Sequence, residues 1–191
     1  MEYVRSILLL LTVAICSSLN FKSDTKHSID INYGTTTLSA EAVPKKPAAP
    51  FAYFMAKMAL LESLDNYTIV NRYGYIGKYQ FSVRTLRGLK RSGYLNVSNE
   101  DIKHFRYRPE IQEQAMRALI RHNLHYLKRS NMLKYIGKEI GGVKITMRGM
   151  LAASHLVGPY GAKQFILSGG RINKKDANGT SVRDYMKEFE V

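Results

Sequence analysis

The sequence predicts a mainly α-helical domain. Three observations indicate this fold class: apolar residues beyond position 50 recur at steps of three and four, glycine-rich joints separate these segments, and the chain contains no internal repeat or low-complexity tract. One stretch after the first helix mixes residue types in a way that favours a loop or a small β-ribbon. The length of 191 residues allows one domain with a sizeable core and additional segments.

The first predicted helix lies at the start of this domain. Its apolar residues have helical spacing, which predicts one buried face: Phe51, Phe54, Met55, Met58, Ala59 and Leu61. Residues 65–78 combine Asn, Tyr, Gly and β-branched residues, so we expect a loop or ribbon there. A second helix is expected over residues 81–90.

The remaining helices are predicted from their caps and periodicity. Pro109 suits the first turn of a helix that continues to about Arg129. Another is expected over residues 131–140, ended by Gly141 and Gly142. Thr146 can cap the next helix, over residues 147–156. Two further segments complete the prediction: 159–167, closed by Gly169 and Gly170, and 181–189, capped by Thr180 or Ser181.

The N-terminal segment has the pattern of a secretory signal. Arg5 precedes an apolar run over residues 7–15, and small polar residues follow. This run is shorter than the roughly 20 residues of a membrane-spanning helix, which makes an uncleaved anchor the weaker alternative. Cys16, the only cysteine, also raises the alternative of a lipidated N-terminus, but Ile15 is bulkier than the residue that lipoprotein signals place there. We therefore assign residues 1–23 to a signal peptide and expect export to the periplasm or cell envelope, with release from the cell left open.

A tether is predicted between the signal and the domain. Residues 24–50 are rich in polar residues and end in VPKKPAAP, whose three prolines prevent regular structure. The domain itself is assigned to residues 51–191.

The net charge of +14 indicates a polyanionic partner. Most of the charge lies beyond residue 50, where 24 Lys and Arg face 11 Asp and Glu. Nucleic acid is one candidate, but a signal peptide directs the chain away from the cytoplasm. Export instead favours the acidic polymers of the envelope, including peptidoglycan, and a merely solvated basic surface remains the alternative.

Glu62 is the leading candidate for a catalytic residue. It occupies the last turn of the first predicted helix, directly before the Tyr- and Gly-rich segment. A carboxyl at the border between a dry core and an open cleft is desolvated, which allows it to act as a general acid on a glycosidic bond. The alternative is an ordinary solvent-exposed glutamate at a helix end.

Three ordered motifs accompany this glutamate. They are Glu62-Ser63, the segment GYIGKYQF over residues 74–81, and the segment AASHL over residues 152–156 followed by Gly158. Together they resemble the soluble lytic transglycosylase family, which has a lysozyme-like fold. In that family a Glu-Ser pair ends one helix, a Gly-x-x-Gln motif opens the next, and an Ala-Tyr-Asn-Ala-Gly segment follows. The resemblance covers about residues 53–189. The chain also resembles, in its sequence pattern, small exported Bacteroides-type proteins described as peptidoglycan-binding.

The resemblance implies a reaction and roles for several residues. Glu62 would protonate the oxygen between N-acetylmuramic acid and N-acetylglucosamine, then accept the proton of the C6 hydroxyl, giving a 1,6-anhydro sugar. Ser63 would orient the glutamate or the substrate, and Gln80 would hydrogen-bond near the cleaved bond. His155 stands, with Ser154, where the family has its tyrosine and asparagine, and the family tyrosine contacts the glutamate or the substrate. No cofactor or metal is implied.

Two further sets of residues are candidates from the residue pattern alone. Tyr75 and Tyr79 lie among amide and cationic residues, a mixture that suits a sugar-binding groove, although buried tyrosines of a small strand would give the same pattern. Asp65 lies three residues after Glu62 and could supply a second carboxylate, but its Asp-Asn context favours a turn.

The sequence thus predicts a monomeric enzyme that cleaves glycan strands of peptidoglycan. Three alternatives stay open: a hydrolytic muramidase on the same fold, a peptidoglycan-binding module without turnover, and an envelope-associated nucleic-acid binder. No nucleic-acid recognition motif supports the last of these.

Overall fold

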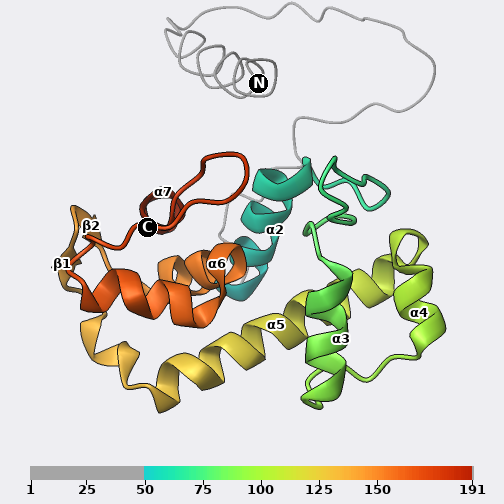
Figure 1. The fold of residues 1–191 in the computed structure, drawn as a ribbon, viewed down its shortest axis with the longest axis horizontal. Helices are drawn as coiled ribbons and strands as arrows, with labels where there is room; N and C mark the ends of the chain where they lie inside the picture. Colours follow the sequence, from blue (N-terminus) through green and yellow to red (C-terminus); the bar gives the residue numbers. More distant parts are fainter. Residues whose placement is uncertain (1–49, 191) are drawn as a thin grey trace, which may run out of the picture. The chain divides into compact units, whose positions relative to one another are not determined.

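The computed structural model describes residues 50–190, which form a mainly helical domain (Figure 1). The predicted signal peptide, Cys16 and nearly all of the predicted tether lie outside the described residues. Within residues 50–190, no helix combines the length and the apolar character needed to cross a membrane.

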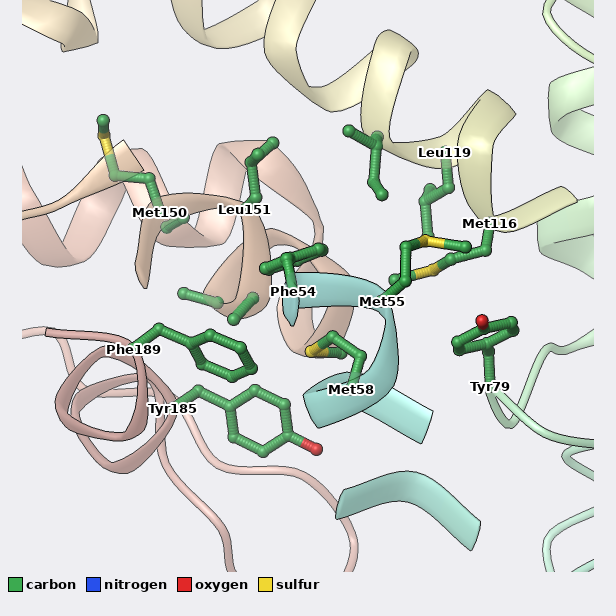
Figure 2. Packing of buried hydrophobic residues seen from close by; sticks show 14 of the residues in the cluster. Phe54, Met55, Met58, Tyr79, Met116, Leu119, Met150, Leu151, Tyr185 and Phe189 are labelled. Carbon is green, nitrogen blue, oxygen red and sulfur yellow. The ribbon is translucent and has the colours of Figure 1, made fainter. Parts of the chain in front are cut away.

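Helix α2, Pro50–Ser63, is the predicted first helix and supplies the centre of the core. Phe54, Met55 and Met58 are at most 6% exposed. Figure 2 shows these side chains between Met116 and Leu119 of one helix and Tyr185 and Phe189 at the C-terminal end of the domain. The rings of Phe54 and Phe189 have centroids 5.2 Å apart. The predicted buried face is confirmed except at Phe51, which is 40% exposed.

The segment after α2 is irregular, as predicted. Leu64 and Asp65 adopt positive φ angles, and the Asp65 amide donates to the Ala59 carbonyl, which ends the helix in a left-handed cap. Two isolated antiparallel bridges, Val70 with Ile76 and Ile76 with Phe81, fold residues 66–81 into a small ribbon. The next helix, α3, is Val83–Arg91 with Ser82 as its N-cap. It therefore begins two residues later than predicted, because Phe81 is paired in the ribbon.

Two short elements and one long helix follow. Helix α4, Asn99–Lys103, has a capping box formed by Ser98 and Asp101, and the 3₁₀-helix η1 covers Phe105–Tyr107. Neither was predicted. Helix α5, Pro109–Arg129, has the predicted bounds and buries one face, including Gln112, Met116 and Leu119.

The predicted helix over residues 131–140 is wrong. The 3₁₀-helix η2 covers only Met132–Tyr135, and strands β1, Glu139–Ile140, and β2, Val143–Lys144, then form an antiparallel hairpin. Gly141 and Gly142 have φ angles of 62° and 75°, the values that the tight turn of such a hairpin requires. The two glycines therefore connect two strands and do not end a helix.

The last two helices complete the core. Helix α6, Met147–Leu167, is capped by Thr146 and is interrupted at Gly158, whose φ and ψ of 75° and 160° are not helical. The two predicted segments thus meet at a kink before Pro159. Helix α7, Val182–Glu188, has a capping box of Ser181 and Asp184 and packs on α6.

We expect the packing of Phe54 against Phe189 to contribute to the stability of the domain. Phe54→Ala should lower the free energy of unfolding by about 3 to 5 kcal/mol, because it removes a buried aromatic ring and leaves a cavity. Phe51→Ala removes the same side chain from an exposed position of the same helix and should cost less than about 1 kcal/mol. Urea denaturation of both variants measures the difference, and equal losses would contradict the packing described.

Candidate active site

Glu62 lies at the boundary between the core and the surface, as the sequence predicted. Its side chain is 14% exposed and belongs to the last turn of α2. The tightly packed Met58 and Ala59 precede it on the same helix. The burial of these residues fixes the end of α2, and the carboxylate therefore has a defined position.

Two side chains from the C-terminal half of the chain hold this carboxylate. The hydroxyl of Tyr185, from α7, donates a hydrogen bond of 2.6 Å to Oε1 of Glu62. Nε2 of His155, from α6, lies 3.4 Å from the same oxygen. Within residues 50–190, no hydrogen bond or ion pair reaches Oε2. One carboxylate oxygen is thus held in place, while the other has no protein partner in the described part of the chain.

Tyr185 is suited to act as a permanent hydrogen-bond donor. It is 8% exposed, and burial together with the negative charge of Glu62 raises the pKa of its hydroxyl far above the usual range. The hydroxyl therefore stays protonated at any physiological pH. Its ring packs in the core beside Phe189, so the hydroxyl cannot turn away from Glu62 without loss of packing (Figure 2).

His155 is a buried ring with one polar contact. Its side chain is 9% exposed, and its ring meets that of Phe81 edge to face at 5.9 Å between centroids. Nδ1 is buried and has no hydrogen-bond partner within the described residues. Glu62 is thus the polar group that this histidine contacts, and the sequence-predicted pair is brought together. Ser154 is also buried, and its hydroxyl donates to the Met150 carbonyl of its own helix.

Ser63 holds the loop that follows Glu62. Its hydroxyl donates to the Lys78 carbonyl at 2.8 Å and accepts from the Asn66 amide at 3.0 Å. Both contacts join the end of α2 to the ribbon of residues 66–81. The hydroxyl therefore orients the ribbon beside Glu62, and its bonds go to backbone groups.

Lys78 is the centre of a polar cluster that the sequence analysis missed. Its ammonium lies 2.8 Å from Asp65 and 3.1 Å from Glu113 of α5, and it donates to the Tyr67 hydroxyl. Burial by itself lowers the pKa of Lys78, but its bonds to Asp65, Tyr67 and Glu113 outweigh this effect and raise the pKa above its usual range. Asp65 is therefore a partner of Lys78 and is not placed here as a second catalytic carboxylate.

The side chain of Gln112, from α5, is hydrogen-bonded to the backbone of the same ribbon. This buried side chain accepts from the Lys78 amide at 2.8 Å and donates to the Tyr67 and Phe105 carbonyls. Gly77 lies so close that a Cβ atom there would be 2.1 Å from Oε1 of Gln112. The glycine of the Gly-x-x-Gln motif, Gly77, is thus required by this close approach and by its φ of 76°.

The predicted sugar-binding role of Tyr79 is wrong. Tyr79 is 1% exposed, and its hydroxyl shares its one proton between the two carboxylate oxygens of Glu113, at 3.0 and 3.1 Å. Burial is the main cause that raises the pKa of this hydroxyl. A side chain enclosed in this way cannot contact a glycan, so Tyr79 is a core residue.

Gln80 and Tyr75 lie in accessible parts of the ribbon. Gln80 is half-buried, and its side-chain amide donates to the Gly77 carbonyl within the same turn. It precedes the bridge residue Phe81 and does not open a helix, contrary to the motif pattern. Tyr75 is 41% exposed, and its amide donates to the side chain of Asn71. Tyr73 spans to the loop before α7, where its hydroxyl donates to the Ala177 carbonyl.

Comparisons with family models, with curated proteins and with solved structures found no match to this chain. Within residues 50–190, no group of three or more His, Cys, Asp or Glu side chains is placed to hold a metal ion. The arrangement offers one oriented carboxylate with a neutral donor and an imidazole on one oxygen, which suits transfer of a proton through the other oxygen.

Tyr185 is the contact residue that sequence reasoning overlooked. Its position relative to Val182, Met186 and Phe189 places it on the apolar face of α7. A tyrosine on such a face needs a partner for its hydroxyl, and this requirement was the available signal. It could not identify Glu62 as that partner, because the two residues are separated by 123 positions.

We expect the Lys78 cluster to hold the ribbon in place. Lys78→Met should destabilise the domain by about 2 kcal/mol, because it leaves Glu113 and Asp65 without their cation. Hydrogen exchange of the backbone amides of residues 66–81 should become faster. The matched control is Lys103→Met, which removes an exposed lysine paired with Glu100 and should cost at most about 0.5 kcal/mol. Unchanged exchange in the Lys78 variant would disprove this role.

Proposed function

We propose that residues 51–191 form a lysozyme-like domain that cleaves peptidoglycan as a lytic transglycosylase, with Glu62 as its single acid and base. The observation that carries this proposal is the partly buried carboxylate whose Oε1 is held by Tyr185 and His155 while Oε2 has no partner within residues 50–190. The resemblance of the three ordered motifs to the soluble lytic transglycosylases supplies the substrate class.

In the proposed reaction, one carboxyl group serves both proton transfers. Glu62 gives its proton from Oε2 to the oxygen that links N-acetylmuramic acid to N-acetylglucosamine, and the bond from C1 of the muramic residue breaks. The C6 hydroxyl of the same residue then attacks C1, and the Glu62 carboxylate accepts the hydroxyl proton. The products are a 1,6-anhydro end and a free N-acetylglucosamine end, and Glu62 regains its initial state.

The contacts of Glu62 support this double use. A general acid that becomes a base needs partners that remain in place while its charge changes. Tyr185 donates to Oε1 in both charge states because its hydroxyl stays protonated. In the family, a tyrosine of the third motif contacts the glutamate or the substrate. Here Ser154 and His155 occupy that region, and the tyrosine hydroxyl on Glu62 comes from α7.

The charge of the domain supports a polyanionic substrate. Beyond residue 50, basic residues exceed acidic ones by 13, and such an excess attracts the carboxylate-bearing peptidoglycan strand. The N-terminal pattern of a signal peptide would bring the domain to the compartment that contains this polymer.

A binding module without turnover is the second candidate. It is favoured by Ser154, which is buried and bonded to its own helix and therefore offers no polar group in place of the family's motif side chains. Such a module would sediment with insoluble cell wall, and Glu62→Gln would bind as well as the unchanged protein.

The central prediction concerns the products. Residues 24–191 incubated with peptidoglycan should release anhydro-muropeptides, detected by mass spectrometry, and Glu62→Gln should abolish their release because the amide cannot donate the proton. Products with reducing ends would instead identify a hydrolytic muramidase. If no fragments are released and the two proteins are indistinguishable, the proposed activity is excluded.

Tyr185 should be needed for activity and much less for folding. Tyr185→Phe keeps the buried ring and removes only the hydroxyl that holds Oε1, so turnover should fall by about tenfold or more while thermal unfolding shifts by a few degrees. Tyr107→Phe removes the same hydroxyl from a residue that is 66% exposed and serves as the control. Full activity of the Tyr185 variant would show that the contact does not assist the reaction.

A further inference from the structure

A hollow lies between the C-terminal ends of α3 and α5 and the later half of α6. Its volume is about 510 Å³, and none of its lining residues contacts Glu62. Four nitrogen-bearing side chains line it, His122, His125, Arg129 and Lys163, together with serine and tyrosine residues. No carboxylate is among the lining residues.

The two cations of this hollow have no acidic partner in the described part of the chain. Ion pairs within residues 50–190 involve Lys57, Lys78, Lys103, Arg108 and two histidines, but neither Arg129 nor Lys163. Lys163 is nevertheless half-buried. A concave surface with uncompensated positive charge concentrates anions.

A hydrogen bond at Nδ1 orients each of the two histidine rings. Nδ1 of His125 is hydrogen-bonded to the Tyr94 hydroxyl, and Nδ1 of His122 donates to the side-chain carbonyl of Asn123 at 3.2 Å. The ring of Tyr94 packs edge to face against both imidazoles. These contacts fix the ring planes and leave Nε2 of each histidine without a partner within the described residues.

We propose that this hollow is a binding site for a doubly charged phosphoryl group. A phosphoryl group has several oxygens that accept hydrogen bonds in different directions, and the site offers a planar guanidinium, an ammonium and two oriented imidazoles. A second hollow, between α3 and α4, also contains basic residues. Glu100 lines that hollow and forms an ion pair with Lys103, and Lys90 donates a hydrogen bond to Asn99. Part of the positive charge of the α3–α4 hollow is therefore already compensated within the protein.

Titration with inorganic phosphate, followed through the imidazole nitrogens by NMR, tests the site. At constant ionic strength, the signals of His122 and His125 should move and saturate below about 20 mM phosphate, a concentration that corresponds to weak but specific binding. Methyl phosphate and a phosphate-bearing polymer, titrated separately, distinguish a free monoester from a phosphate group on a polymer. Chloride should not produce the same shifts.

Two matched double variants identify the residues responsible. Arg129→Gln with Lys163→Gln should weaken phosphate binding by about tenfold or more. Arg87→Gln with Lys90→Gln removes one exposed arginine and one half-buried lysine from the α3–α4 hollow, with the same change in net charge, and should leave binding unchanged. Glu62→Gln should also bind phosphate normally, since the site is separate from the proposed cleavage site.

Three results would overturn the proposal. One is a shift that grows linearly with phosphate, without saturation. A second is an equal loss of binding in the two double variants, which would indicate general charge attraction. The third is a loss of stability without any change in binding when Arg129 and Lys163 are replaced, which would mean that these residues contribute only to folding.

Discussion

The burial of one face of α2 in the core determines where the carboxylate at its end lies. Phe54, Met55 and Met58 contact side chains of α5, α6 and the C-terminal end, so a single helix connects the parts of the core (Figure 2). Glu62 follows on the same rigid helix. The position of the carboxylate therefore follows from the packing of the apolar residues that precede it on α2. The favourable free energy of burying these residues offsets the unfavourable free energy of partly desolvating the carboxylate.

Two separate polar systems then define the surroundings of Glu62. Tyr185 and His155 hold the carboxylate itself, while Lys78, Gln112 and Ser63 hold the ribbon that runs beside it. The second system uses backbone groups as well as side chains, which explains why the ribbon is ordered with almost no regular pairing. A loop with few ladder bonds can be rigid when buried side chains bond its amides and carbonyls.

The sequence was sufficient for features that depend on neighbouring residues. Apolar periodicity and caps predicted α2, α5, the two parts of α6 and α7, because Pro109, Thr146 and Ser181 act locally. The prediction from sequence was wrong over residues 131–140. A Gly-Gly pair can end a helix or form the turn of a hairpin, and Gly141 and Gly142 form the turn. Tyr79 was misassigned because its spacing is the same whether it faces Glu113 or solvent. The partners of Glu62 depend on tertiary contacts between distant segments, which no local pattern contains.

The hydrogen bond between Tyr185 and Glu62 also determines when, during synthesis and folding, the surroundings of Glu62 can form. A chain is synthesised from its N-terminus, so α2 is complete while more than half of the domain has yet to be made. The carboxylate receives its donor only when α7, the last helix, has been synthesised and docked on α6. A contact between such distant positions requires closure of a long loop, whose entropic cost slows its formation. An incomplete or unfolded chain therefore carries Glu62 without its organised surroundings, and the site exists only in the finished molecule.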